Sequence, residues 1–300
     1  MWFKNLSVFR LPTNWTLDIA KLDEQLARQA LQPCGNLDKE TQGWVSPRGD
    51  DRLSHVLNGQ ILVALGTESK LLPGSIVTQF ANERAAELEE QQGYKLGRKQ
   101  MRELKEQITE ELLPRAFVRR RITWAWIDPV HGWLVVDAAT PLKAEEVLER
   151  LNKTLDDLPA RTLHTELSPA AAMTEWLLAG EAPTGFSIDR DLELCAIDES
   201  KSTVRYVRHA LEGDEIQQHI AAGKTATRLA MTWNDKVSFV LSEQLQLKRI
   251  TFLDILKEET EHGESADEQF DLDFALMSGE LAKLLDDVVT ALGGEKAKPI

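Results

Sequence analysis

The spacing of apolar residues over the first 72 positions predicts strands alternating with a helix. Residues 2–10 form an apolar run that Pro12 stops, which predicts a first strand. Apolar residues then recur every three or four positions from Ile19 to Ala30, which predicts an amphipathic helix. Residues 60–65 predict a strand, and a turn at 55–59 joins it to a short partner. We interpret residues 1–72, with 114–160, as an N-terminal α+β body.

The segment 73–113 has a helical pattern on both sides of a break at Gly93 and Gly97. Pro73 suits the first turn of a helix, and Leu113-Pro114 ends the pattern. The spacing predicts two antiparallel helices of about 16 residues, each roughly 25 Å long at a rise of about 1.5 Å per residue. We expect this hairpin to project from the body as an arm.

Residues 115–127 alternate in the manner of a strand. Because successive side chains point to opposite faces, Arg120, Ile122, Trp124 and Trp126 are expected on one face. Arg119, Arg121 and Thr123 are then expected on the other face. The His131-Gly132 turn leads into a second strand at 133–137, and a helix near 144–151 follows.

The second half, residues 161–300, predicts a C-terminal α+β region. Apolar residues step by three and four from Phe270 to Leu292, and Gly293-Gly294 ends this helix. Its apolar stripe is more typical of core packing than of a dimer seam. The acidic segment 257–268 predicts a loop. Other helices are expected after Ser168-Pro169 and at 213–222, and strands at 186–196, 204–209, 225–233, 236–241 and 247–252. The fold class is thus α+β, with mixed or antiparallel sheets.

Composition places the chain among ordinary folded proteins. It has 300 residues, 42% of them hydrophobic, and no run approaches the roughly 18 apolar residues of a membrane span. The N-terminal run is too short and too polar for a signal-peptide core, so we expect a cytoplasmic protein without a membrane partner. Cys34 and Cys195 could form one disulfide, but two reduced and mostly buried thiols are the favoured interpretation.

Charge changes this picture because it is unevenly distributed. The net charge of −14 argues by itself against nucleic acid, since phosphate binding needs cations that displace counterions. However, residues 93–121 carry nine basic residues against four acidic ones, whereas residues 254–287 carry two against twelve. A basic inner surface on an acidic protein is one interpretation. Simple solvation of the helices is the other.

Catalytic and metal-binding motifs are absent from the sequence. The six histidines form no HxxxH or HExxH pair, and the two cysteines form no CxxC pair. Ala222-Gly223-Lys224-Thr225 resembles the end of a phosphate-binding loop, but here a helix precedes Gly223 and a strand follows. Asp271, Asp273 and Glu280 lack the spacing of a two-metal site, so their favourable position near a helix N-terminus explains them better. We expect no metal, no cofactor and no catalysis.

The basic residues are the remaining candidate site. Arginine suits phosphate because its planar guanidinium binds two oxygens, and no base-reading motif is present. The pattern therefore indicates contacts to the DNA backbone without sequence preference, with a protein-only interaction surface as the alternative. The candidate DNA-binding residues are Arg115, Phe117, Arg119, Arg120 and Arg121 after the arm; Lys95, Arg98, Lys99 and Arg102 at its tip; and Arg205, Arg208 and Lys224 in the second half, where Lys201 and Arg228 lie nearby.

Several sequence words, in family order along the whole chain, resemble proteins of the RdgC family. They are Met1-Trp2-Phe3-Lys4-Asn5-Leu6, Pro33-Cys34-Gly35, Gly43-Trp44-Val45, Leu112-Leu113-Pro114-Arg115-Ala116-Phe117, Trp126-Ile127-Asp128, Thr174-Glu175-Trp176, His219-Ile220 with Ala222-Gly223-Lys224, and Leu276-Met277 with Gly279-Glu280-Leu281. Together they are far more specific than any single motif.

The resemblance implies a crescent-shaped subunit, two of which close into a ring-shaped homodimer with a positively charged hole. It implies binding of double-stranded DNA, and also of single strands, without sequence preference. It further implies association with the nucleoid, restraint of the RecA recombinase, and no catalysis. Relatives can carry an aromatic residue near the position of Arg120, so the arginine here favours phosphate contact over a wedge between bases.

Overall fold

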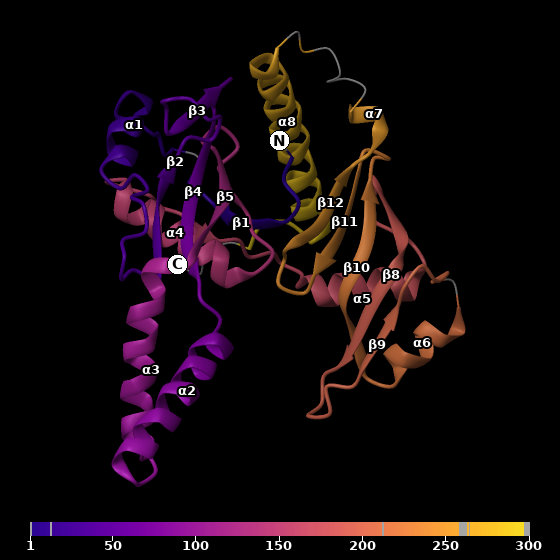
Figure 1. The fold of residues 1–300 in the computed structure, drawn as a ribbon. Helices are drawn as coiled ribbons and strands as arrows, with labels where there is room; N and C mark the ends of the chain where they lie inside the picture. Colours follow the sequence, from indigo (N-terminus) through magenta and orange to yellow (C-terminus); the bar gives the residue numbers. More distant parts are fainter. Residues whose placement is uncertain (1, 13, 212, 258–262, 264, 297–300) are drawn as a thin grey trace.

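The computed structural model describes residues 2–12, 14–211, 213–257, 263 and 265–296. Within them, twelve strands form one sheet in the order β2-β4-β5-β6-β1-β12-β11-β10-β8-β9, with β3 beside β4 and β7 beside β1 (Figure 1). All pairs between these strands are antiparallel. The α+β class is confirmed, but separate sheets are not: β1 pairs with β6 on one side and β12 on the other, and so joins both halves.

The elements follow one another in a simple order. The strands are β1 (Leu6–Arg10), β2 (Glu40–Val45), β3 (Ser54–Leu57), β4 (Gln60–Leu71), β5 (Phe117–Asp128), β6 (Trp133–Asp137), β7 (Arg161–Thr162), β8 (Phe186–Ala196), β9 (Thr203–Tyr206), β10 (Lys224–Trp233), β11 (Val237–Ser242) and β12 (Leu247–Phe252). The helices are α1 (Ile19–Ala27), α2 (Gly74–Gln92), α3 (Arg98–Leu112), the 3-10 turn η1 (Leu113–Arg115), α4 (Pro141–Thr154), α5 (Pro169–Ala179), α6 (Asp214–Ala221), α7 (Asp254–Lys257) and α8 (Ala266–Ala291).

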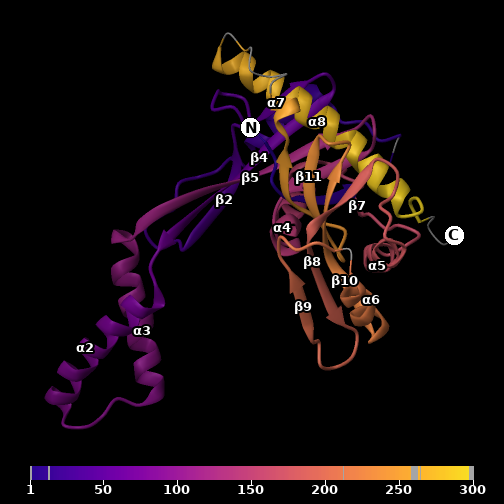
Figure 2. The same ribbon diagram turned by 90° about the vertical axis from the view of Figure 1, so that its right-hand side faces the viewer.

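Different helices cover the two faces of the sheet. One face, here called the α8 face, buries Leu6, Trp126 and Leu247 in a core with α5 and α8. The opposite face, here called the α4 face, buries Ile127 and Val136 in a core with α1 and α4. In Figure 2, α5, α6 and α8 lie on the side of β8–β11 away from the arm, so the α4 face of these strands is turned toward it.

The predicted helical arm is confirmed. Helices α2 and α3 pack against each other through a small core of their own, formed by Val77, Ala81, Ala85, Leu104 and Ile108. Gly93 ends α2 in the left-handed conformation (φ 76°), which glycine adopts without strain. The arm and the β8–β9 hairpin leave opposite ends of the sheet and extend to the same side of the molecule (Figure 1).

Several predicted boundaries were wrong, for local reasons. The first strand begins only at Leu6, and Arg115 precedes β5 because it ends the η1 turn, which begins at Leu113 and contains Pro114. Strand β9 ends at Tyr206, since Arg208 adopts a left-handed conformation (φ 54°) that a ladder does not accommodate.

Part of the predicted acidic loop is helical. Residues 254–257 form α7, and α8 begins at Ala266 because the Ser265 side chain accepts a hydrogen bond from the Glu268 N–H. Acidic residues in the first turn of α8 also favour its N-terminus. Residues 258–262 and 264 of that predicted loop lie outside the described residues. The apolar stripe of α8 packs in the core, as expected.

Candidate nucleic-acid interface

The arginines of β5 stand on a free strand edge. Residues Ala125–Asp128 pair with β6, whereas Phe117–Trp124 pair only with β4. Arg115, Arg119, Arg120 and Arg121 are all exposed, and no ion pair among the described residues involves them. Charged side chains on an unpaired edge also discourage pairing with other strands. These arginines can therefore both keep other strands from pairing with this edge and remain accessible to a polyanion.

The predicted alternation along β5 is confirmed. Arg121 lies opposite Thr67 of β4, which Lys143 of α4 contacts at 3.5 Å from the α4 face. Arg119 shares that face, because it is two residues away. Arg120 lies opposite Glu68 and is on the α8 face, in line with Trp126. The three neighbouring arginines thus divide between two faces.

Phe117 is the most exposed large apolar side chain of this region, with 83% of its surface accessible. It lies opposite Leu71, at the end of β4 where the arm begins. The four cations expected on the arm are exposed as well. Lys99 and Arg102 approach Glu103 and Glu106 one turn away, at 3.8 and 3.6 Å, whereas no ion pair is found for Lys95 or Arg98 within the described chain.

The candidate cations of the second half lie around one end of β8, β9 and β10. Arg205 projects from β9 and is ion-paired with Glu193 of β8 at 2.5 Å. The Arg208 N–H donates to Asp191 Oδ1 at 2.9 Å, which holds the turn after β9. Lys224 is half-buried and opens β10 directly after Gly223, which has a φ of 87°. Helix α6 precedes this glycine and a strand follows it, as predicted.

A pocket of about 190 Å³ on the C-terminal strands contains cations that sequence reasoning had missed. Its charged lining, here called the β8–β12 pocket, consists of Asp191, Glu193, Arg205, Arg228, Lys248 and Arg249. The sequence pattern of β12 alone does not single out Lys248 and Arg249, because they join the other cations only when strands β8 to β12 lie side by side in the sheet. Leu247 is buried on the α8 face, which places the next residue, Lys248, on the opposite face; the left-handed Arg249 then breaks the alternation before the buried Ile250.

Glu193 organises the centre of this pocket. It lies opposite both Arg205 and Arg228 in the strand ladder, and it accepts a hydrogen bond from the Thr227 hydroxyl at 3.0 Å. Burial opposes ionisation of Glu193, but the Thr227 hydroxyl and the Arg205 guanidinium outweigh it and hold the pKa of the carboxyl below its usual range. The carboxylate therefore remains charged and aligns two guanidinium groups.

The strand ladder also relates the two cation groups. Ala125 of β5 pairs with Val136 of β6, which in turn pairs with Ser7 of β1. Leu6 pairs with Leu247 on the α8 face, so Ser7 and Lys248 both belong to the α4 face. The sheet thus carries the following cations on one face: Arg119, Arg121, Arg205, Arg228 and Lys248.

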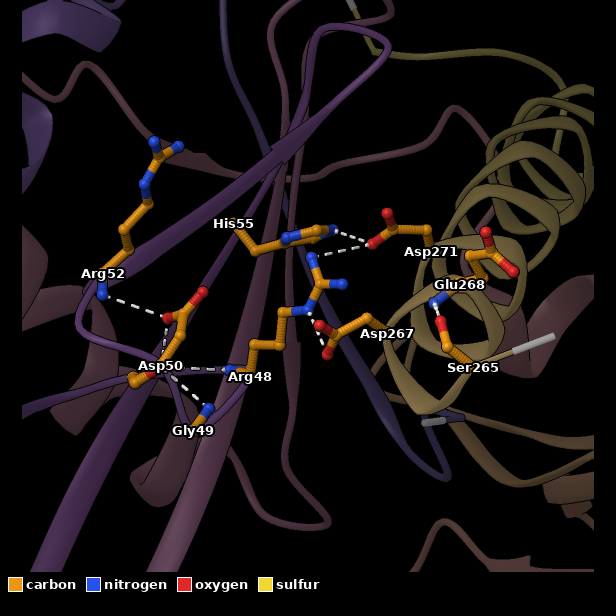
Figure 3. A network of polar contacts seen from close by, with 10 residues as sticks. Arg48, Gly49, Asp50, Arg52, His55, Ser265, Asp267, Glu268 and Asp271 are labelled. Carbon is orange, nitrogen blue, oxygen red and sulfur yellow. Dashed lines mark hydrogen bonds and ion pairs between the residues drawn. The ribbon is translucent and has the colours of Figure 1, made fainter. Parts of the chain in front are cut away.

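The acids once considered as a nuclease cluster have other partners. Asp271 Oδ1 faces Arg48 Nη1 and His55 Nε2, each at 3.3 Å, at the junction between α8 and the loop before β3 (Figure 3). Asp273 accepts a hydrogen bond from Gln269, and Glu280 is paired with Lys236 and Lys283. Among the described residues no group of three or more potential metal ligands converges.

Two further findings concern the rest of the chain. Cys34 and Cys195 are both free thiols, as predicted, but each is only half-buried, so the expectation of mostly buried thiols was wrong. None of the helices in the described ranges is both long enough and apolar enough to cross a membrane.

The fold and the site define a class: an acidic protein of mixed α/β structure that carries a cationic face on one antiparallel sheet. Comparison with known proteins gives the family. A family model described as "Putative exonuclease, RdgC" matches residues 1–295. The chain is 57% identical to the Recombination-associated protein RdgC of Herminiimonas arsenicoxydans, over 99% of this chain and 100% of that protein. It is 56% identical to the protein of the same name from Dechloromonas aromatica, over 98% of each chain. The chain therefore belongs to the RdgC family.

The two descriptions differ on catalysis. The family description contains the word exonuclease, whereas the names of the relatives state an association with recombination. The expectation that this chain is not an enzyme stays a prediction.

Proposed function

We propose that this chain binds double-stranded DNA without sequence preference through the α4 face of its sheet. The observation that carries the proposal is the placement of Arg119 and Arg121, which have no ion-pair partner among the described residues, on the same face as Arg228 and Lys248, in a chain whose net charge is −14. Cations gathered on one face create a local positive field despite the overall sign. The helices on the far side of β8–β11 leave that face turned toward the arm (Figure 2).

The contacts expected on this face are to phosphates. The candidate side chains are arginines and lysines on strands, where no recognition helix presents them to base edges. Backbone contacts of this kind give an affinity that falls steeply with salt and depends little on sequence. Single-stranded DNA offers the same phosphates and is expected to bind by the same residues.

We further propose that two copies form a ring around the duplex. The arm and the β8–β9 hairpin extend to the same side from opposite ends of the sheet, which suits contacts with a second copy at both ends. A closed ring is retained on DNA by topology even when each local contact is weak. A protein placed in this way on the nucleoid occupies DNA that the RecA recombinase needs, and so restrains recombination.

Fluorescence anisotropy on three duplexes of unrelated sequence, repeated across salt concentrations, tests the DNA proposal. We expect Kd values within about threefold of one another, and a log–log salt slope of several units at about 0.9 per phosphate contacted. Preference for one sequence, or an affinity independent of salt, would contradict it. Absence of binding would favour the alternative, a protein-interaction regulator that acts through its acidic surface.

Retention on nicked circular and linear duplexes of the same sequence tests the ring. After assembly at low salt and a wash at high salt, we expect the protein to remain on the circle and to leave the linear duplex through its ends. Equal loss from both would contradict encirclement. Light scattering of the free protein measures whether it is the expected dimer.

A further inference from the structure

The β8–β12 pocket contains more positive than negative charge. Four cations and two carboxylates line it, and they come from four different strands of the sheet. The pocket volume of about 190 Å³ is far above the roughly 10–15 Å³ that one water needs. A small anion can therefore enter without rearrangement of the sheet.

Three of the four cations already have a carboxylate partner. Glu193 is paired with Arg205 at 2.5 Å and approaches Arg228 at 3.7 Å. Asp191 accepts from the Arg208 N–H through Oδ1, and its Oδ2 lies 3.6 Å from Arg249 Nη1. The two acids thus hold Arg205 close and draw Arg228 and Arg249 toward the pocket.

Lys248 is the exception. It is half-buried on β12 and lies opposite Val240 of β11, and no carboxylate of the described residues lies within ion-pair distance of its ammonium group. Burial lowers the pKa of Lys248, and the nearby Arg228 lowers it further. A partly desolvated cation beside a second cation gains from an anion in the pocket.

We propose that a single phosphate group binds in the β8–β12 pocket, with the Lys248 ammonium as its central ligand and Arg228 and Arg249 beside it. The excess of two positive charges balances a free phosphate dianion and more than balances the single charge of a backbone phosphodiester, and guanidinium groups offer paired donors to the oxygens of either. The site rests on the proposed function when the phosphate belongs to a DNA backbone. Free phosphate presents the same chemistry, so the experiment must separate the two sources.

The first measurement follows Lys248 directly. Lysine amines of the full chain are converted to ¹³C-dimethylamines, and the Lys248 resonance is assigned by its absence in Lys248→Arg. In a pH titration, this resonance is expected to have its midpoint below those of the exposed lysines. Inorganic phosphate at millimolar concentration is expected to shift the midpoint upward, because the anion favours the charged form.

The second measurement uses a 20-base-pair duplex and three variants. Lys248→Met removes the charge and keeps much of the side-chain volume, and we expect it to weaken binding about 5- to 20-fold. Lys21→Met removes an exposed lysine of α1 as a matched control and should change Kd less than twofold. Lys248→Arg keeps the charge, and its affinity should persist to higher pH than that of the wild type.

The outcomes separate the pocket from the proposed function. A shift of Lys248 with phosphate and with duplex, together with selective loss in Lys248→Met, supports a backbone subsite. A shift with phosphate but not with duplex supports the phosphate site and assigns it to free phosphate. If neither probe moves Lys248, the pocket proposal is overturned, even where the wild type binds duplex normally. If the wild type binds no duplex, the proposed function fails, while the phosphate titration still decides the pocket.

Discussion

The β5 arginines and the β8–β12 pocket are two cation groups of opposite design. On β5, Arg119, Arg120 and Arg121 are exposed on a strand edge without an ion-pair partner within the described chain. In the pocket, Arg205 and Arg228 share Glu193, whose side chain is only 14% exposed. The β5 arginines keep their full positive charge and their side-chain freedom. In the pocket, the carboxylates cancel part of the positive charge but restrict the movement of the guanidinium groups.

The difference teaches what each group can contribute to binding a polyanion. Free surface cations act through counterion release, which is strong at low salt and indifferent to geometry. Cations paired with half-buried carboxylates lose less conformational entropy on binding than free surface cations, so they favour one arrangement of phosphates. The contribution of the β5 arginines to DNA affinity should therefore depend strongly on salt, whereas the contribution of the pocket should depend on it weakly.

The largest effect is expected from neutralising the free group. The triple variant R119Q/R120Q/R121Q should weaken duplex binding roughly 100-fold near physiological salt, because it removes cations that have no ion-pair partner in the part of the chain that the structure describes. Its log–log salt slope should fall by about 2, since each phosphate contact contributes about 0.9 and Arg120 faces the other side of the sheet. Anisotropy titrations at four salt concentrations measure both quantities.

A control with the same change in net charge makes this test specific. K21Q/R28Q/R52Q removes three exposed cations: Lys21 of α1, Arg28 at the C-cap of that helix, and Arg52 in the loop before β3. We expect less than a threefold change in Kd for this variant. Equal losses in the two triple variants would mean that overall charge, and not the position of the β5 arginines, determines affinity.

Adjacent arginines on opposite faces provide a finer test. Arg121 lies on the α4 face and Arg120 on the α8 face. If DNA lies against the α4 face, R121Q should weaken binding about fivefold, and R120Q less than twofold. Both changes remove one charge from neighbouring positions of one strand, so each is the control for the other. The reverse order would place the duplex on the α8 face.

The assignment of residues to the two faces shows how much of the site could be predicted from the sequence. The alternation of residues 115–127 was predictable because Trp124 and Trp126 follow a period of two along one strand. That Lys248 joins Arg121 on one face was not predictable, because it depends on the register of β5, β6, β1 and β12, which lie far apart in the chain. The single sheet was missed for the same reason. Arg249 was hidden by its left-handed backbone (φ 53°), which no strand pattern indicates.

Glu193 offers a way to make the pocket resemble the β5 edge. In Glu193→Gln, the amide oxygen can still accept from Thr227, but the charge that offsets Arg205 and Arg228 is gone. We expect Kd to fall about threefold at low salt and the salt slope to rise by up to about 1, as the pocket gains free charge. Weaker binding with an unchanged slope would show instead that alignment of the guanidinium groups matters more than their charge.

The smallest effect is expected at the junction of α8 with the β3 side of the sheet, which lies on the α8 face. Burial lowers the pKa of the His55 imidazole below its usual 6.5, although Asp271 opposes this. The unfolded chain then takes up the proton at a higher pH than the folded chain. The stability that depends on neutral His55 is therefore complete above about pH 6.5 and decreases as the pH falls below it.

His55→Phe removes the titrating group and keeps a ring against Phe270 and Phe274. Between pH 7.5 and 5.5, the Tm of the wild type should fall about 2 °C more than that of the variant, as calorimetry can measure. Duplex affinity at pH 7.5 should be the same for both proteins, because the charges of this junction are paired with one another on the side opposite to the α4 face (Figure 3).

If the Tm of the wild type and of His55→Phe fell equally with pH, His55 would not be a source of acid sensitivity. If His55→Phe bound the duplex more weakly than the wild type, the α8 face would take part in binding.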